Sequence, residues 1–176
     1  MPGKTSVALI GFMGAGKSAV AGLLATRTGK TLVEIDSIIE RESGKSIPGI
    51  FAEEGEIGFR EREIQAVKDI APLRNKIVAC GGGLVLNRIN IDRLKEDCVV
   101  IWLEASPGAV KKRIGGPEGS RPLLRGSPEE LRRMMAFRRP FYSRAADVKI
   151  NTTRIALDEV VESVMSELKK NADFCW

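Results

Sequence analysis

The 176-residue sequence contains no histidine, which excludes a catalytic triad or a zinc site built on that residue. It has only three cysteines, Cys80, Cys98 and Cys175, and their spacing fits no metal motif. An odd cysteine count does not suggest a disulfide framework, so we expect a reduced, cytoplasmic setting. Cys80 and Cys98 lie in apolar runs, where thiols are typically buried.

Aromatic residues are few, with six Phe, two Trp and one Tyr, and the chain has no long block of like charges. Both features argue against nucleic acid as a partner. No apolar run is long enough for a signal peptide or a membrane span, so we expect no membrane association. The net charge of +5, with its basic excess between Lys111 and Arg144, suits an anionic small molecule.

The length fits one domain over residues 1–176, long enough to bury a core. Apolar runs alternate with helical patterns, which is typical of a parallel sheet covered on both faces. The sequence therefore predicts an α/β chain, with a three-layer α/β/α arrangement around a five-stranded parallel sheet. We expect strands at 6–10, 31–35, 76–80, 98–103 and 148–150, and helices at 17–28, 37–42, 47–53, 57–70, 88–95, 107–113, 128–144 and 157–170.

Residues 11–18, Gly-Phe-Met-Gly-Ala-Gly-Lys-Ser, match the phosphate-binding loop pattern G-x-x-x-x-G-K-[ST]. An apolar strand pattern precedes them and a helical pattern follows. Glycines let backbone N–H groups point at phosphate oxygens, and the helix N-terminus adds its positive dipole end. Lys17 would reach the β/γ-phosphates and the Ser18 hydroxyl would bind Mg²⁺. A chance glycine-rich turn is the alternative, but four fixed positions in this context favour a nucleoside triphosphate site and a P-loop NTPase fold.

Candidate acceptor-binding residues follow the next two expected strands. Glu34 and Asp36 end the second strand and Gly81–Gly83 follow the third, at the edge where open α/β sheets bind ligands. Asp36 could orient an acceptor hydroxyl and take its proton, or could equally cap the helix that begins at Ser37. The three glycines permit close approach of a ligand to the backbone, although a tight turn is the simpler explanation.

Two arginines and one glycine-rich segment complete the candidates. Arg60 and Arg138 have aromatic neighbours in sequence, which suits a guanidinium that captures a carboxylate or phosphate, although either could be a solvated surface charge. Residues 114–126 contain four glycines and two prolines among arginines, a composition that predicts either a surface loop or a mobile lid over about 113–126. The phosphate-binding loop favours the lid.

Together these segments resemble the shikimate kinase family, from about Val7 to Lys169. The motifs occur in the family's order: residues 11–18, Ile35–Glu40, Ser46–Phe51, Glu54–Glu56, Phe59-Arg60, Gly81–Gly83, Arg121–Leu124, and Arg138 with Pro140-Phe141-Tyr142. The resemblance implies a nucleoside monophosphate kinase-like fold. It also implies transfer of the ATP γ-phosphate to the 3-hydroxyl of shikimate, on the pathway to chorismate and the aromatic amino acids.

The resemblance also implies roles for individual residues. Asp36 would hold the ring hydroxyls and act as base, Arg60 and Arg138 would bind the shikimate carboxylate, and the Gly82 backbone would contact a hydroxyl, all within a substrate segment of about 34–63 and its partners. Glu63 would brace Arg60, and Lys17 and Arg121 would neutralise the transferring phosphoryl group. The implied ATP-binding residues are Gly14, Ala15, Gly16, Lys17, Ser18, Ala19, Arg113, Arg121, Asn151, Thr152 and Thr153.

The chain departs from the family at the metal site. The family often has Asp-x-Asp where this sequence has Glu34-Ile35-Asp36. Glutamate keeps the charge, so we expect Mg²⁺ at Ser18 with Glu34 in the outer shell, and Glu104 as a lesser rival. The expected partners are ATP, Mg²⁺ and shikimate, bound by a monomer. Rival functions are a gluconate kinase on the same scaffold, a silent nucleotide-binding regulator and a nucleic-acid-binding P-loop protein.

Overall fold

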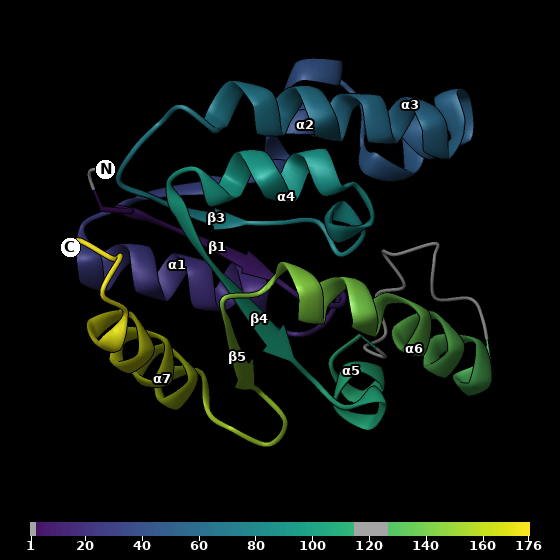
Figure 1. The fold of residues 1–176 in the computed structure, drawn as a ribbon. Coiled ribbons are helices and arrows are strands. Elements are labelled where there is room, and N and C mark those ends of the chain that lie inside the picture. Colours follow the sequence, from purple (N-terminus) through teal and green to yellow (C-terminus); the bar gives the residue numbers. More distant parts are fainter. Residues whose placement is uncertain (1–2, 115–126) are drawn as a thin grey trace.

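The computed structural model describes residues 3–114 and 127–176, and its centre is one parallel sheet (Figure 1). The five strands lie in the order β2-β3-β1-β4-β5. Because all strands are parallel, their carboxyl ends meet at one edge. The strands are β1 (Ser6–Ile10), β2 (Thr31–Glu34), β3 (Lys76–Ala79), β4 (Cys98–Glu104) and β5 (Val148–Asn151).

Helices cover both faces of the sheet, which confirms the predicted three-layer arrangement. Figure 1 shows α1 (Lys17–Thr28) and α7 (Leu157–Lys170) on one face, and α3 (Ile47–Ile70) and α4 (Arg88–Lys95) on the other. Within the described residues, no helix is long and apolar enough to cross a bilayer. The remaining elements are α2 (Ile35–Ser43), the short 3₁₀ helix η1 (Leu84–Leu86), α5 (Pro107–Ile114) and α6 (Pro128–Ala145).

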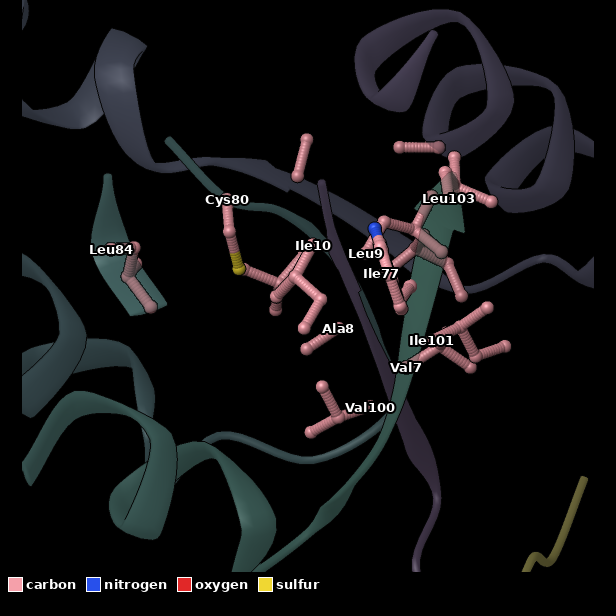
Figure 2. Packing of buried hydrophobic residues seen from close by; sticks show 14 of the residues in the cluster. Val7, Ala8, Leu9, Ile10, Ile77, Cys80, Leu84, Val100, Ile101 and Leu103 are labelled. Atoms are coloured by element: carbon pink, nitrogen blue, oxygen red, sulfur yellow. The ribbon is translucent and has the colours of Figure 1, made fainter. Parts of the chain in front are cut away.

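The core consists of the central strands, which are apolar on both faces because helices cover both. In Figure 2, Ala8, Ile10 and Val100 lie on one side of the strands, and Leu9 and Ile101 lie on the other. All five side chains are fully buried. This packing holds β1 between β3 and β4, so the loop that follows β1 lies in the middle of the ligand-binding edge.

Two predicted boundaries differ from the structure in ways that affect the site. The second strand ends at Glu34, and α2 already begins at Ile35. Asp36 therefore lies inside the first turn of α2, so the alternative that it caps a helix at Ser37 is wrong. The helices expected at 47–53 and 57–70 form one element, α3, which is interrupted by Gly55 with φ 70° and ψ −171°. A positive φ favours glycine there, because side chains strain this conformation.

The C-terminal segment packs against the N-terminus, a contact that the sequence did not predict. The Lys4 N–H donates to the Asp173 carbonyl at 2.7 Å, and the Cys175 N–H donates to the Lys4 carbonyl at 2.8 Å. Phe174 is buried, and the Lys30 ammonium lies 5.4 Å from the centre of its ring. The segment therefore closes the end of the molecule opposite the ligand-binding edge.

We expect Phe174→Ala to lower the free energy of unfolding by about 3–5 kcal/mol, because it removes a buried ring and leaves a cavity. Urea denaturation measures this change. Trp176, which is 52% exposed, provides the matched control, and Trp176→Ala should cost less than about 1 kcal/mol. Equal losses in the two variants would contradict the packing of Phe174.

Candidate active site

The phosphate-binding loop between β1 and α1 has the backbone that its glycines predict. Gly14 has φ 73° and Gly16 has φ 98°. A Cβ on Gly14 would lie 2.7 Å from the Ile114 side chain, so this position also requires a residue without a side chain. The loop therefore turns tightly enough to direct several amide groups toward one point.

The N-terminus of α1 is open to an anion. Among the described residues, Gly16 receives no capping side chain, and the first turn of α1 has no acidic residue. Ser18 and Ala19 are exposed there. Lys17 folds back over the loop, and its Nζ donates to the carbonyls of Gly11 at 2.9 Å and Phe12 at 3.0 Å. This arrangement concentrates positive charge where a phosphate would bind.

Arg113 connects the far side of the loop to the segment after β5. Its guanidinium donates to the Gly14 carbonyl at 3.2 Å and to the Thr152 carbonyl at 2.6 Å. The buried Thr152 hydroxyl donates to the Ala15 carbonyl at 3.1 Å. The side chains of Asn151 and Thr153 accept backbone N–H groups, from Thr153 and Ser106 respectively. The structure thus brings these four predicted nucleotide-binding residues to one side of the loop.

The glycine triplet after β3 lies against three different parts of the site. A Cβ on Gly81 would lie 3.0 Å from Asp36 Oδ1 and 3.1 Å from Glu63 Oε1. One on Gly82 would lie 3.3 Å from the Met13 amide nitrogen in the phosphate-binding loop. A tight turn alone would not require this, so the triplet serves close packing, and any side chain here would displace a functional group.

Arg60 contacts the last glycine of the triplet. A Cβ on Gly83 would lie 2.7 Å from Cζ of Arg60. The Arg60 guanidinium donates to both carboxylate oxygens of Glu63, at 3.0 and 3.1 Å, and to Glu56 at 3.3 Å. The predicted Glu63 brace is therefore present, and Glu56 is a second partner of Arg60, a contact that the sequence did not predict.

Glu63 is fully buried, and its environment changes its titration. Burial raises the pKa of Glu63 from 4.5 to about 7, although the positive charge of Arg60 opposes the shift. The nearby carboxylate of Asp36 adds to the increase. The charges of Glu63, Asp36 and Arg60 thus influence one another beside the end of β3.

Arg138 approaches the triplet from α6. Its Nη1 donates to the Gly82 carbonyl at 3.4 Å, and its guanidinium lies 5.5 Å from the centre of the Phe12 ring. Its Nε is buried and has no hydrogen-bond partner among the described residues. A buried donor without a partner is costly, so the position of Arg138 has a reason other than stability, such as a role in binding.

Tyr142 also contributes to the site, although the sequence motif that contains it suggested no role for it. It lies four residues after Arg138, one turn along the same face of α6, and its hydroxyl donates to the Gly82 carbonyl. Burial raises the pKa of this phenol, with Arg138 opposing the shift, so the hydroxyl remains a donor. The Gly82 carbonyl is thus engaged by α6, and a ligand that contacts Gly82 would use its N–H. The i, i+4 spacing was the available signal.

The two candidate metal carboxylates have different surroundings. Glu104 pairs with Arg139 at 3.2 Å and Lys149 at 3.5 Å, which disfavours a cation there. Glu34, at the carboxyl end of β2, takes part in none of the salt bridges among residues 3–114 and 127–176. Arg121 and nearly all of the expected lid lie outside the described residues.

Comparison with known proteins agrees with this geometry. A family model described as shikimate kinase matches residues 13–169. Shikimate kinase of Symbiobacterium thermophilum is 42% identical over 96% of this chain and 98% of its own length. Shikimate kinase of Dehalococcoides mccartyi is 37% identical over 97% of each chain. Shikimate kinase from Acinetobacter baumannii, solved in complex with shikimate, has a TM-score of 0.90 at 30% identity, over 96% of this chain and 95% of that one. The chain belongs to the shikimate kinase family.

Proposed function

We propose that this chain transfers the γ-phosphoryl group of ATP to the 3-hydroxyl of shikimate. The glycine triplet supports this most directly, because Asp36, Arg60 and Arg138 all approach it beside the phosphate-binding loop. The relative from Acinetobacter baumannii was solved with shikimate. A gluconate kinase gives no reason for the combined Phe59-Arg60, triple-glycine and Arg-Pro-Leu-Leu motifs, and a silent regulator gives no reason to retain Lys17 and Asp36.

The acceptor half of the site would bind shikimate with cationic side chains at the carboxylate and an anionic side chain at the ring hydroxyls. Arg60 and Arg138 would hold the carboxylate, since guanidinium groups form paired, charge-assisted hydrogen bonds with carboxylates. Asp36 would hold ring hydroxyls and accept the proton of the attacking hydroxyl. Glu63 would keep Arg60 in place through its two hydrogen bonds.

The ATP half would use backbone amides and two cations. The loop amides and the N-terminus of α1 would bind the phosphates, and Lys17 would move from its carbonyl partners to the transferring group. Arg113 and residues 151–153 would border the nucleotide. Arg121 would add charge, a role proposed from its Arg-Pro-Leu-Leu motif alone.

The donor set fits Mg²⁺, which usually binds few protein groups besides phosphates. The Ser18 hydroxyl would be a direct ligand, and Glu34 would act through water, because α1 begins and β2 ends at the same edge of the sheet. The ion would neutralise charge on the β- and γ-phosphates. We also propose a monomer, since one chain supplies both halves of the site, and a reducing cytoplasm, which suits three free thiols.

A coupled assay of ADP release tests the reaction itself. With Mg²⁺ and ATP, we expect turnover to depend on added shikimate, while gluconate and a reaction without acceptor give only background. Product analysis should show the phosphate on the 3-hydroxyl. ADP release that is equally fast without shikimate would overturn the assignment of the acceptor.

Lys17→Ala should lower kcat on the order of 100-fold or more, because it removes a charge that stabilises the transition state. Shikimate binding, measured by calorimetry without nucleotide, should be unchanged and so report intact folding. A kcat within threefold of wild type would show that Lys17 does not act on the transferring phosphoryl group.

Arg138→Ala should raise the KM for shikimate by about tenfold or more, as expected for a lost charge-assisted hydrogen bond. The KM for ATP should stay within about twofold. Arg139, the next residue of α6, pairs with Glu104 instead, so Arg139→Ala is the matched control and should leave both values unchanged. An equal loss of affinity for both substrates in Arg138→Ala would contradict its assignment to the carboxylate.

The raised pKa of Glu63 predicts a pH dependence of stability. Its folded-state pKa of about 7 lies above its usual 4.5, so the stabilisation is complete below about pH 4.5 and is lost as pH rises through about 7. Glu63→Gln removes this titration. The difference in free energy of unfolding, wild type minus variant, should therefore shrink between about pH 5 and about pH 8 in urea denaturation. A difference that grows with pH would show that Arg60, and not burial, dominates.

A further inference from the structure

An ion-pair network crosses the break in α3, away from the residues assigned above. Gly55 separates the first part of the helix from the part that carries Arg60 and Glu63. An interruption of this kind leaves the angle between the two helical segments free unless side-chain contacts fix it. The first part also carries Phe51, which stacks on Phe59 at a centroid distance of 4.7 Å.

Glu54 and Arg62 connect the two parts. Both carboxylate oxygens of Glu54 accept from Arg62, with Nε and Nη2 each at 2.8 Å. Lys45, which precedes α3, lies 3.5 Å from Glu54 and also pairs with Glu53. The Arg62 hydrogen bond lowers the pKa of Glu54, as a carboxylate held by a guanidinium requires. Two parallel hydrogen bonds fix direction as well as distance.

Gly58 makes room for this network. A glycine inside a helix costs about 0.5–1 kcal/mol relative to alanine, so its presence needs a reason. A Cβ on Gly58 would lie 2.5 Å from Cβ of Glu54 and 3.1 Å from its Oε2. Glu54 thus lies across the Gly58 backbone on its way to Arg62.

The network lies on the same helical segment as the proposed carboxylate-binding residue. Arg62 is two residues from Arg60 and one from Glu63, on the same segment of α3. The Arg60 guanidinium lies 5.2 Å from the centre of the Phe59 ring, whose other neighbour is Phe51. A change of angle at Gly55 would therefore shift the support of Arg60 while leaving the phosphate-binding loop untouched.

We infer that Glu54 and Arg62 are positioning residues for the acceptor, which fix the angle of α3 at Gly55 and thereby the placement of Arg60. Gly58 is required because a Cβ at this position would collide with the Glu54 side chain. The inference rests on the proposed role of Arg60 in binding shikimate. It deepens that role by assigning affinity for the acceptor to a half-buried ion pair outside the residues proposed to bind the substrate.

Kinetics of the full chain with Glu54→Gln, Arg62→Gln and the double variant test this inference. We expect each single variant to raise the KM for shikimate by about three- to tenfold, the range of a well-formed bidentate pair. The values of kcat and the KM for ATP should stay within about twofold. The double variant should be no worse than either single variant, because one interaction is removed only once. Arg62→Lys, which keeps the charge, should recover part of the affinity.

Two matched controls separate the network from general effects. Glu162→Gln breaks a surface ion pair in which one carboxylate oxygen lies 2.5 Å from Nη1 of Arg27 in α1, and it should leave the KM for shikimate unchanged. Gly58→Ala should raise this KM like the charge variants, whereas Gly22→Ala, where a Cβ meets nothing within 4 Å, should not.

Arg60→Ala distinguishes failure of the positioning role from failure of the proposed function. If Arg60→Ala raises the KM for shikimate and the Glu54 and Arg62 variants do not, the positioning role is overturned and the proposed function stands. If Arg60→Ala leaves the KM unchanged, the acceptor assignment itself fails. An equal rise of both KM values in the Glu54 and Arg62 variants would also overturn the positioning role, since it would indicate a loosened fold.

Discussion

The close approach of Gly81, Gly82 and Gly83 to their neighbours is the constraint on which the site depends. Each glycine leaves space for a different group: the carboxylates of Asp36 and Glu63, the backbone of the phosphate-binding loop, and the Arg60 guanidinium. Phosphoryl transfer depends on positioning, because the protein supplies little covalent chemistry. A strand end without side chains lets donor and acceptor sites share one wall, which brings the two substrates within reach of each other.

Charges around this wall are held in place by the protein before any ligand binds. Arg60 is fixed by Glu63 and Glu56, and Arg138 packs beside Phe12 with a hydrogen bond to Gly82. Such preorganisation reduces the cost of ordering side chains when a substrate binds. It also gives a role to the buried Glu63. When Glu63 accepts hydrogen bonds from one nitrogen of the Arg60 guanidinium, the other N–H groups of Arg60 remain to bind a ligand.

Features that depend on neighbouring residues were predictable. The helices 17–28, 88–95 and 157–170 match the structure at both ends, because their periodicity and end signals are local. The break at Gly55 also agrees with the gap between two predicted helices. Asp36 was different: its sequence position allowed a helix cap or a catalytic role, and only the start of α2 at Ile35 excluded the cap.

The sequence by itself determined the fold class, the phosphate-binding loop and, through the order of its motifs, the family, because these follow from short patterns and backbone preferences. Tertiary structure decided which distant side chains meet. Asp36, Arg60, Gly82 and Arg138 come together only because β3 lies between β2 and β1, and because α6 packs over the end of β3. That strand order depends on burying the apolar strands β1, β3 and β4 between two layers of helices. The contact of Tyr142 with Gly82 depends on this order, and the contact of Glu54 with Arg62 depends on the angle of α3 at Gly55.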